Sequence, residues 1–234
     1  MFSERRLRFL VPLVLLAAIA ISIDAGERSG SAKKRITAEE CEGLVRQLVN
    51  PNKPPFKERY TFPEKLKYRE IQKQQEKICR AYDSLSDNFE ISLPILVKHV
   101  DDDRFSYVYE DVGTSGVIVK ASVGFACLQM IDVHVEVYRR EVTKPDFAFI
   151  PRCPSFIFEE CGGVKKWWQS RKKKTLAQLQ LEGIEWALRL KKPRLFESDE
   201  EWNKAKKALG KMAAEIRASN KPIKVEHHLH TLSK

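Results

Sequence analysis

Hydrophobic positions recur once per helical turn along several stretches of the chain, and polar positions fill the faces between them. The first stretch opens at Thr37, and Glu40 follows three residues later in the pattern of a reciprocal capping box. Its apolar residues then come at intervals of three and four: Cys41, Leu44, Val45, Leu48 and Val49. This spacing predicts an amphipathic helix that ends at Asn50-Pro51.

Further stretches of the same kind follow, over about 63–85, 92–100, 121–138, 175–192 and 198–216. Thr175 and Ser198 repeat the capping-box spacing, and Pro94 suits the first turn of its helix, where a missing N–H costs nothing. Residues 141–164 look irregular. The pattern predicts a mainly α fold of about five or six helices. They form one compact domain, residues 37–218, with an irregular or short β segment around 105–119.

The two ends of the chain do not follow this pattern. Three arginines within residues 1–8 precede an apolar run over residues 9–23, and small residues follow at Ala25-Gly26. This order is typical of a signal peptide, residues 1–25, and predicts a periplasmic, cell-envelope or extracellular protein. An uncleaved helix that anchors the chain is the alternative. We expect a flexible leader over 26–36 and a flexible tail over 219–234.

Charge and cysteine content add two constraints. Lys and Arg number 42 against 32 Asp and Glu, and the net charge of +10 permits binding to anionic partners. The chain has five cysteines, and three of them lie on apolar helix faces, where a thiol behaves as a small hydrophobic group. Cys153 and Cys161 lie in the irregular segment. We expect these two as a possible disulfide, which an oxidising compartment would allow.

One part of the chain resembles a known repeat. Residues 91–103, Ile-Ser-Leu-Pro-Ile-Leu-Val-Lys-His-Val-Asp-Asp-Asp, combine a Leu-Pro start, an aliphatic ridge and an acidic end, and residues 122–131 place small residues after Val123. Over about residues 89–135 the chain resembles the helical hairpin of a HEAT repeat, although the connection 104–120 is long and the sequence shows no second copy. The resemblance implies a protein-binding surface without catalytic residues. Otherwise the chain resembles exported bacterial proteins.

The most unusual segment is basic and aromatic, and it spans residues 165–174. Six cations flank two adjacent tryptophans just before a helix: Lys165, Lys166, Trp167, Trp168, Arg171, Lys172, Lys173 and Lys174. Such a surface suits phosphate groups or an anionic lipid interface. The alternative is that one Trp packs into the core, the other covers the start of the helix, and the lysines are solvated. Adjacent residues cannot both face inward on one helix, so we expect one Trp to be exposed.

Other polar groups favour structural roles. The triple aspartate, residues 101–103, lacks the alternating oxygen spacing of a calcium loop and indicates a helix end. His227, His228 and His230 have no accompanying cysteine or carboxylate cluster, so we predict no metal site there. His134 lies on an apolar helix face and indicates a hydrogen-bonded core histidine, and His99 lies near a helix end, where it suits the dipole.

Sequence signatures of enzymes are missing: the chain has no GxSxG, no HExxH and no glycine-rich phosphate loop. We therefore expect a non-enzymatic binding or scaffold protein that needs no cofactor. Its partner would be a protein or an anionic envelope surface rather than a specific nucleic acid. One alternative is a structural envelope protein that binds a protein through the helical hairpin. Another is a hydrolase with a spatially assembled site, such as Cys153 beside His99 or His134.

Overall fold

The computed structural model describes residues 36–54, 60–61, 69–111, 117–139, 156–191, 198–225, 227 and 229. All of them belong to one compact unit, Arg35–Lys234. The expected signal peptide and nearly all of the leader lie outside the described residues. No helix within the described ranges is both long and apolar enough to cross a membrane.

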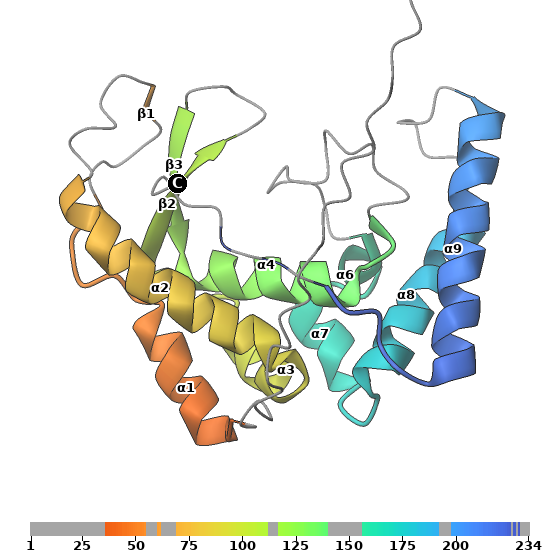
Figure 1. Ribbon diagram of the computed structural model, residues 1–234, viewed down its shortest axis with the longest axis horizontal. Helices are drawn as coiled ribbons and strands as arrows, with labels where there is room; N and C mark the ends of the chain where they lie inside the picture. The colour runs from red at the N-terminus through yellow and green to blue at the C-terminus, as the bar shows by residue number, and fades with distance from the viewer. Residues whose placement is uncertain are drawn as a thin grey trace, which may run out of the picture. The chain divides into compact units, whose positions relative to one another are not determined.

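The described chain is mainly helical, as predicted, and has a small antiparallel sheet (Figure 1). The strands are β1 (Tyr60–Thr61), β2 (Phe105–Asp111) and β3 (Val117–Ser122). The helices are α1 (Ala38–Gln47), α2 (Arg69–Asp87), α3 (Phe89–Lys98), α4 (Val123–Val135), α6 (Phe156–Glu160), α7 (Val164–Gln169), α8 (Leu176–Arg189) and α9 (Asp199–Ser219).

The helix starts confirm the capping patterns. The Thr37 hydroxyl accepts a hydrogen bond from the backbone N–H of Glu40 at 3.1 Å, and the Glu40 carboxylate accepts one from the backbone N–H of Thr37 at 2.7 Å. Thr175 forms the same reciprocal pair at the start of α8. The Ser198 hydroxyl accepts from the backbone of Glu201 at 3.1 Å. These bonds satisfy N–H groups that a helix start leaves without intrahelical partners.

The ambiguous region around 105–119 is a β hairpin. Strands β2 and β3 pair antiparallel, with Tyr109 opposite Val119, and β1 pairs with the other edge of β3. The strand β3 also includes Ala121 and Ser122, so the prediction that the next helix begins at residue 121 is wrong by two residues. The physical reason is the cap: Ser122 keeps extended backbone angles, and its hydroxyl accepts from the N–H of Phe125 at 3.0 Å.

Two local expectations need correction. Helix α3 begins at Phe89, so Pro94 lies inside the helix rather than in its first turn. Pro94 has no N–H to donate to the carbonyl of Glu90, four residues earlier. Because both residues are exposed, water can donate a hydrogen bond to that carbonyl instead. The segment 141–164 is not irregular throughout, because α6 occupies its end. Helix α6 has only five residues, which is too short for apolar residues to recur at helical spacing in the sequence.

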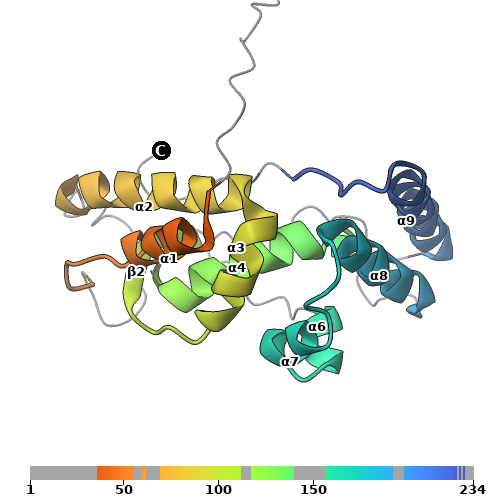
Figure 2. The ribbon, with the colours of Figure 1, turned by 90° about the horizontal axis from the view of Figure 1, so that it is seen from below.

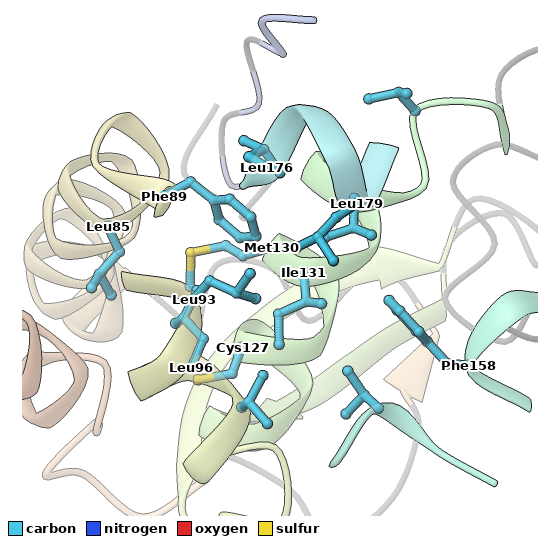
Figure 3. Close-up of a cluster of buried hydrophobic side chains, with 14 of the residues drawn as sticks. Leu85, Phe89, Leu93, Leu96, Cys127, Met130, Ile131, Phe158, Leu176 and Leu179 are labelled. Carbon is cyan, nitrogen blue, oxygen red and sulfur yellow. The ribbon is translucent and has the colours of Figure 1, made fainter. Parts of the chain in front are cut away.

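The core is centred on α4, which contacts α3, α8 and both long strands. Figure 3 shows the side chains of Leu93 and Leu96 on α3 directed toward those of Met130 and Ile131 on α4. All four are buried. Most apolar residues of these two helices therefore lie inside the domain, and the strands β2 and β3 lie between the two helices in the sequence.

The start of α4 approaches the end of α3 very closely at Gly124. The backbone N–H of Gly124 donates to the Asp102 carbonyl at 2.8 Å, and a Cβ atom at position 124 would lie 2.4 Å from the carbonyl oxygen of Val100. Real Cβ atoms do not come this close to backbone oxygen. Only glycine fits this position without a backbone shift.

We predict opposite effects of alanine at two helical glycines. Gly124→Ala should lower the free energy of unfolding by about 1–3 kcal/mol, because α4 must move away from α3. Gly210→Ala in α9 should raise it by about 0.5–1 kcal/mol, because a Cβ there meets nothing within 4 Å and alanine favours helix. Urea unfolding followed by circular dichroism measures both. A Gly124 variant as stable as the wild type would contradict the close approach.

Part of the expected flexible tail packs against the domain instead. Asn220, the residue after the end of α9, adopts a left-handed conformation with φ 51°. The chain then turns back toward α2 (Figure 2). His227 and Leu229 are buried, and Ile223 and Val225 pack on the core. Burial of the apolar side chains of Ile223, Val225 and Leu229 stabilises the packing of this part of the tail on the domain.

Candidate anionic-partner surface

The basic-aromatic segment forms α7 and the turn that leads into α8. Two glycines with positive φ angles, Gly162 at 75° and Gly163 at 104°, redirect the chain between α6 and α7. The N–H of Gly163 donates to the Phe158 carbonyl at 2.7 Å, which fixes this reversal. Helix α7 then packs on α3. Because α7 is short, this reversal decides which of its side chains face the core.

Trp167 faces inward and is completely buried. Its ring meets Phe158 edge to face at a centroid distance of 4.7 Å, and the Arg171 guanidinium lies 5.6 Å above it. The indole N–H has no hydrogen-bond partner among the described residues. Trp167 therefore stabilises the fold through packing and contributes nothing to the surface.

Trp168 is only partly buried, as expected for the neighbour of an inward-facing residue on a helix. Its ring lies 6.2 Å from that of Trp167 and packs against the edge of the core. Part of the indole therefore faces solvent. Trp168 is the aromatic group of the segment that an external partner can reach.

Three of the six cations are held in ion pairs. Lys165 on α7 pairs with Asp101, just after α3. Arg171 and Lys174 both pair with Glu182 on α8, and the distance from Lys174 Nζ to the carboxylate is 2.6 Å. The Glu182 hydrogen bond raises the pKa of Arg171. Burial opposes ionisation of Glu182, but the bonds from Arg171 and Lys174 lower its pKa.

The other three cations are Lys166, Lys172 and Lys173. All three are exposed, and none has an acidic partner within the part of the chain that the structure describes. They lie on either side of Trp168 in sequence. We call these four residues the Trp168 surface. The structure thus divides the predicted segment into an inward anchor, three paired cations, and three exposed lysines that flank the partly exposed Trp168 in sequence.

The triple aspartate follows the end of α3, as predicted, and the described contacts of its carboxylates are with basic side chains and with the backbone N–H of Arg104. Asp102 binds Arg104, whose Nε lies 2.9 Å from the carboxylate, and this bond lowers the pKa of Asp102. His99 Nε2 lies 3.0 Å from Glu42, and its Nδ1 lies 3.6 Å from Asp102. No group of three or more histidine, cysteine or acidic side chains in the described ranges is arranged to hold a metal ion.

His134 is a core histidine with a hydrogen bond, as predicted, and its partner is one that the sequence did not reveal. Its Nε2 lies 2.7 Å from the Ser86 hydroxyl, and its ring stacks on Phe89 with centroids 4.3 Å apart. Burial lowers the pKa of His134 to about 4. The sequence does place Ser86 beside Leu85 on the buried face of α2. The spacing of residues along one helix, however, does not show which residue 48 positions away contacts this serine.

The structure describes four of the five cysteines, so it bears on only some of the cysteine predictions. Cys153 lies outside the described residues, so its bridge to Cys161 stays a prediction, as does a nucleophilic Cys153 beside a histidine. Within the described ranges no disulfide joins Cys41, Cys79, Cys127 and Cys161 to one another. Cys41 and Cys127 are buried, and burial raises the pKa of Cys127 to about 12. A thiol with so high a pKa stays protonated and is a poor nucleophile.

No protein-family model, curated protein or solved structure matches this chain.

Proposed function

We propose that this chain is an exported, non-enzymatic protein that binds an anionic envelope surface through the Trp168 surface. The observation that carries the proposal is that three exposed lysines flank the partly buried Trp168 in sequence and have no acidic partner among the described residues. Lysine near an anionic surface gains electrostatic free energy, and an indole favours the interface. Export rests on the N-terminal pattern of charge and hydrophobicity.

The local fold supports this role because it holds the surface in place. Trp167 anchors α7 in the core, and Glu182 ties the following turn to α8 through Arg171 and Lys174. The exposed lysines therefore project from a fixed backbone, so binding does not have to order it. A fixed backbone loses less conformational entropy on binding than a flexible chain does.

The test reverses the charge of the surface. Lys166→Glu, Lys172→Glu and Lys173→Glu combined should weaken cosedimentation with phosphatidylglycerol vesicles on the order of a hundredfold, at about 1 kcal/mol per lysine. Vesicles of phosphatidylcholine should retain neither protein. Because salt screens exposed charges, wild-type binding should fall between low and physiological ionic strength.

A matched variant separates this surface from net charge. Lys204, Lys207 and Lys211 form an exposed row on α9, and changing all three to Glu alters the net charge of the chain equally. This control should keep most of the binding. If both triple variants lose binding to the same extent, the interaction depends on overall charge and the proposed surface is wrong.

A further inference from the structure

The carboxylate of Glu182 on α8 is shared by two cations of the basic-aromatic segment. Its Oε1 accepts hydrogen bonds from the Arg171 guanidinium, whose Nε lies at 2.8 Å, and its Oε2 accepts one from Lys174 Nζ at 2.6 Å. One negative charge thus faces two positive charges. Glu182 therefore reduces the positive charge of this part of the molecule without cancelling it.

Arg171 is fixed by several contacts besides this ion pair. Its Nη1 donates to the Trp167 carbonyl at 3.1 Å and to the Ser170 hydroxyl at 2.8 Å. Its guanidinium also lies over the buried Trp167 ring, and only 17% of its side chain is exposed. Arg171 would have to break all these contacts to reach an external partner. It therefore acts as the permanent partner of Glu182.

Lys174 differs from Arg171 in its exposure and in its contacts. Its side chain is 42% exposed, and among the described residues its ammonium group contacts Glu182 alone. An ion pair that faces solvent contributes little stability, because water solvates both charges. If Lys174 leaves, Glu182 still accepts hydrogen bonds from Arg171. Lys174 can therefore exchange one anionic partner for another at small cost.

Two successive backbone turns place Lys174 near the Trp168 surface. The N–H of Arg171 donates to the Trp168 carbonyl at 2.9 Å, and the N–H of Lys174 donates to the Arg171 carbonyl at 2.9 Å. A turn closed by such a bond brings its first and last Cα atoms within about 7 Å. Lys172 and Lys173 lie inside the second turn and are exposed. An anionic surface that contacts these two lysines is within reach of the Lys174 ammonium.

We propose that Lys174 is a fourth cation of the Trp168 surface and that Glu182 competes with the anionic ligand for it. In the free protein the Lys174 ammonium pairs with Glu182. On an anionic membrane it pairs with a lipid phosphate instead, while Arg171 keeps Glu182. This inference rests on the proposed function, and it makes Glu182 an internal carboxylate that limits the affinity of the surface.

The test removes the competing charge. Glu182→Gln keeps an oxygen that can accept a bond from Arg171, and it should bind phosphatidylglycerol vesicles about fivefold more tightly than the wild type. The matched control is Glu185→Gln on the same helix, where Glu185 pairs with Arg217 at 2.7 Å. This control changes the net charge equally and should leave vesicle binding nearly unchanged. Cosedimentation at low ionic strength measures all three proteins.

A second substitution tests whether the gain comes from Lys174. Lys174→Gln alone should weaken binding about two- to fivefold, and Glu182→Gln should add little in its presence. Such a double-mutant cycle isolates the interaction between the two side chains. Loss of structure would weaken binding, so the expected gain cannot come from misfolding. If Glu182→Gln strengthens binding equally with and without Lys174, the carboxylate acts only through overall charge and the inference is wrong.

The wild type separates this inference from the proposed function. Vesicles that retain neither the wild type nor Glu182→Gln would contradict both. Equal retention of the wild type, Glu182→Gln and Glu185→Gln would overturn this inference alone. If Glu182→Gln does not fold, Lys174→Gln is compared with Lys211→Gln, the same charge change at an exposed lysine of α9. Lys174→Gln should weaken binding more, and equal effects would refute the role of Lys174.

Discussion

Replacing Trp167 by alanine is expected to lower the free energy of unfolding by about 3–5 kcal/mol, whereas the same change at Trp168 should cost about 1 kcal/mol or less. Trp167 is completely buried, and its removal leaves a cavity between Phe158 and Arg171. Trp168 is only partly buried, so its loss removes less apolar contact. Urea unfolding monitored by circular dichroism gives both values.

Binding to vesicles should depend on Trp168 and not on Trp167, which is the reverse of their expected effects on stability. Trp168→Ala should retain a cooperative unfolding transition and bind phosphatidylglycerol vesicles less tightly than the wild type, because the partly exposed indole is lost. The matched variant Trp167→Phe keeps an aromatic group in the core and should bind normally. Similar stability losses at the two positions would contradict the inward orientation of Trp167.

Acidification from pH 7 to pH 4 is expected to lower the free energy of unfolding by about 3 kcal/mol through His134 alone. Burial lowers the pKa of His134 from its ordinary value of 6.5 to about 4, although the nearby Asp87 carboxylate opposes this shift. Between these two values the unfolded chain takes up a proton that the folded chain does not. The folded state is therefore favoured fully above pH 6.5, and this advantage is lost as the pH falls toward 4.

The variant His134→Gln isolates this contribution, because glutamine does not titrate and can still bond to Ser86. Urea unfolding at several pH values should show a flatter profile for the variant between pH 4 and 6.5. Identical profiles for His134→Gln and the wild type would contradict the burial of His134.

The helical part of the fold was predictable because its signals are local. Apolar spacing placed α1, α8 and α9 within a few residues, and their N-terminal caps depend on a hydroxyl at one residue and the N–H three residues later. The β hairpin was only partly visible, since Phe105–Tyr109 alternates but the pairing of its strands depends on residues well separated in sequence. The five-residue helix α6 is too short to show a repeat.

The candidate surface was predictable as a segment but not as an arrangement. Sequence shows that Trp167 and Trp168 cannot both face inward, yet the choice between them depends on the chain reversal at Gly162 and Gly163. Likewise, Arg171 and Lys174 gain a shared partner only because Glu182 projects back toward the turn. The packing of Ile223, Val225, His227 and Leu229 on the core was not predictable, because these residues are few and lie among lysines and histidines.

The pairing of α3 with α4 has a consequence for the order of folding. Both helices and the hairpin between them come from one continuous stretch, residues 89–135, so many central contacts join residues that are near in sequence. Short loops lose little entropy on closing, and contacts of low sequence separation form early. We expect this stretch to collapse first and to serve as the template on which α1, α8 and finally the C-terminal segment assemble.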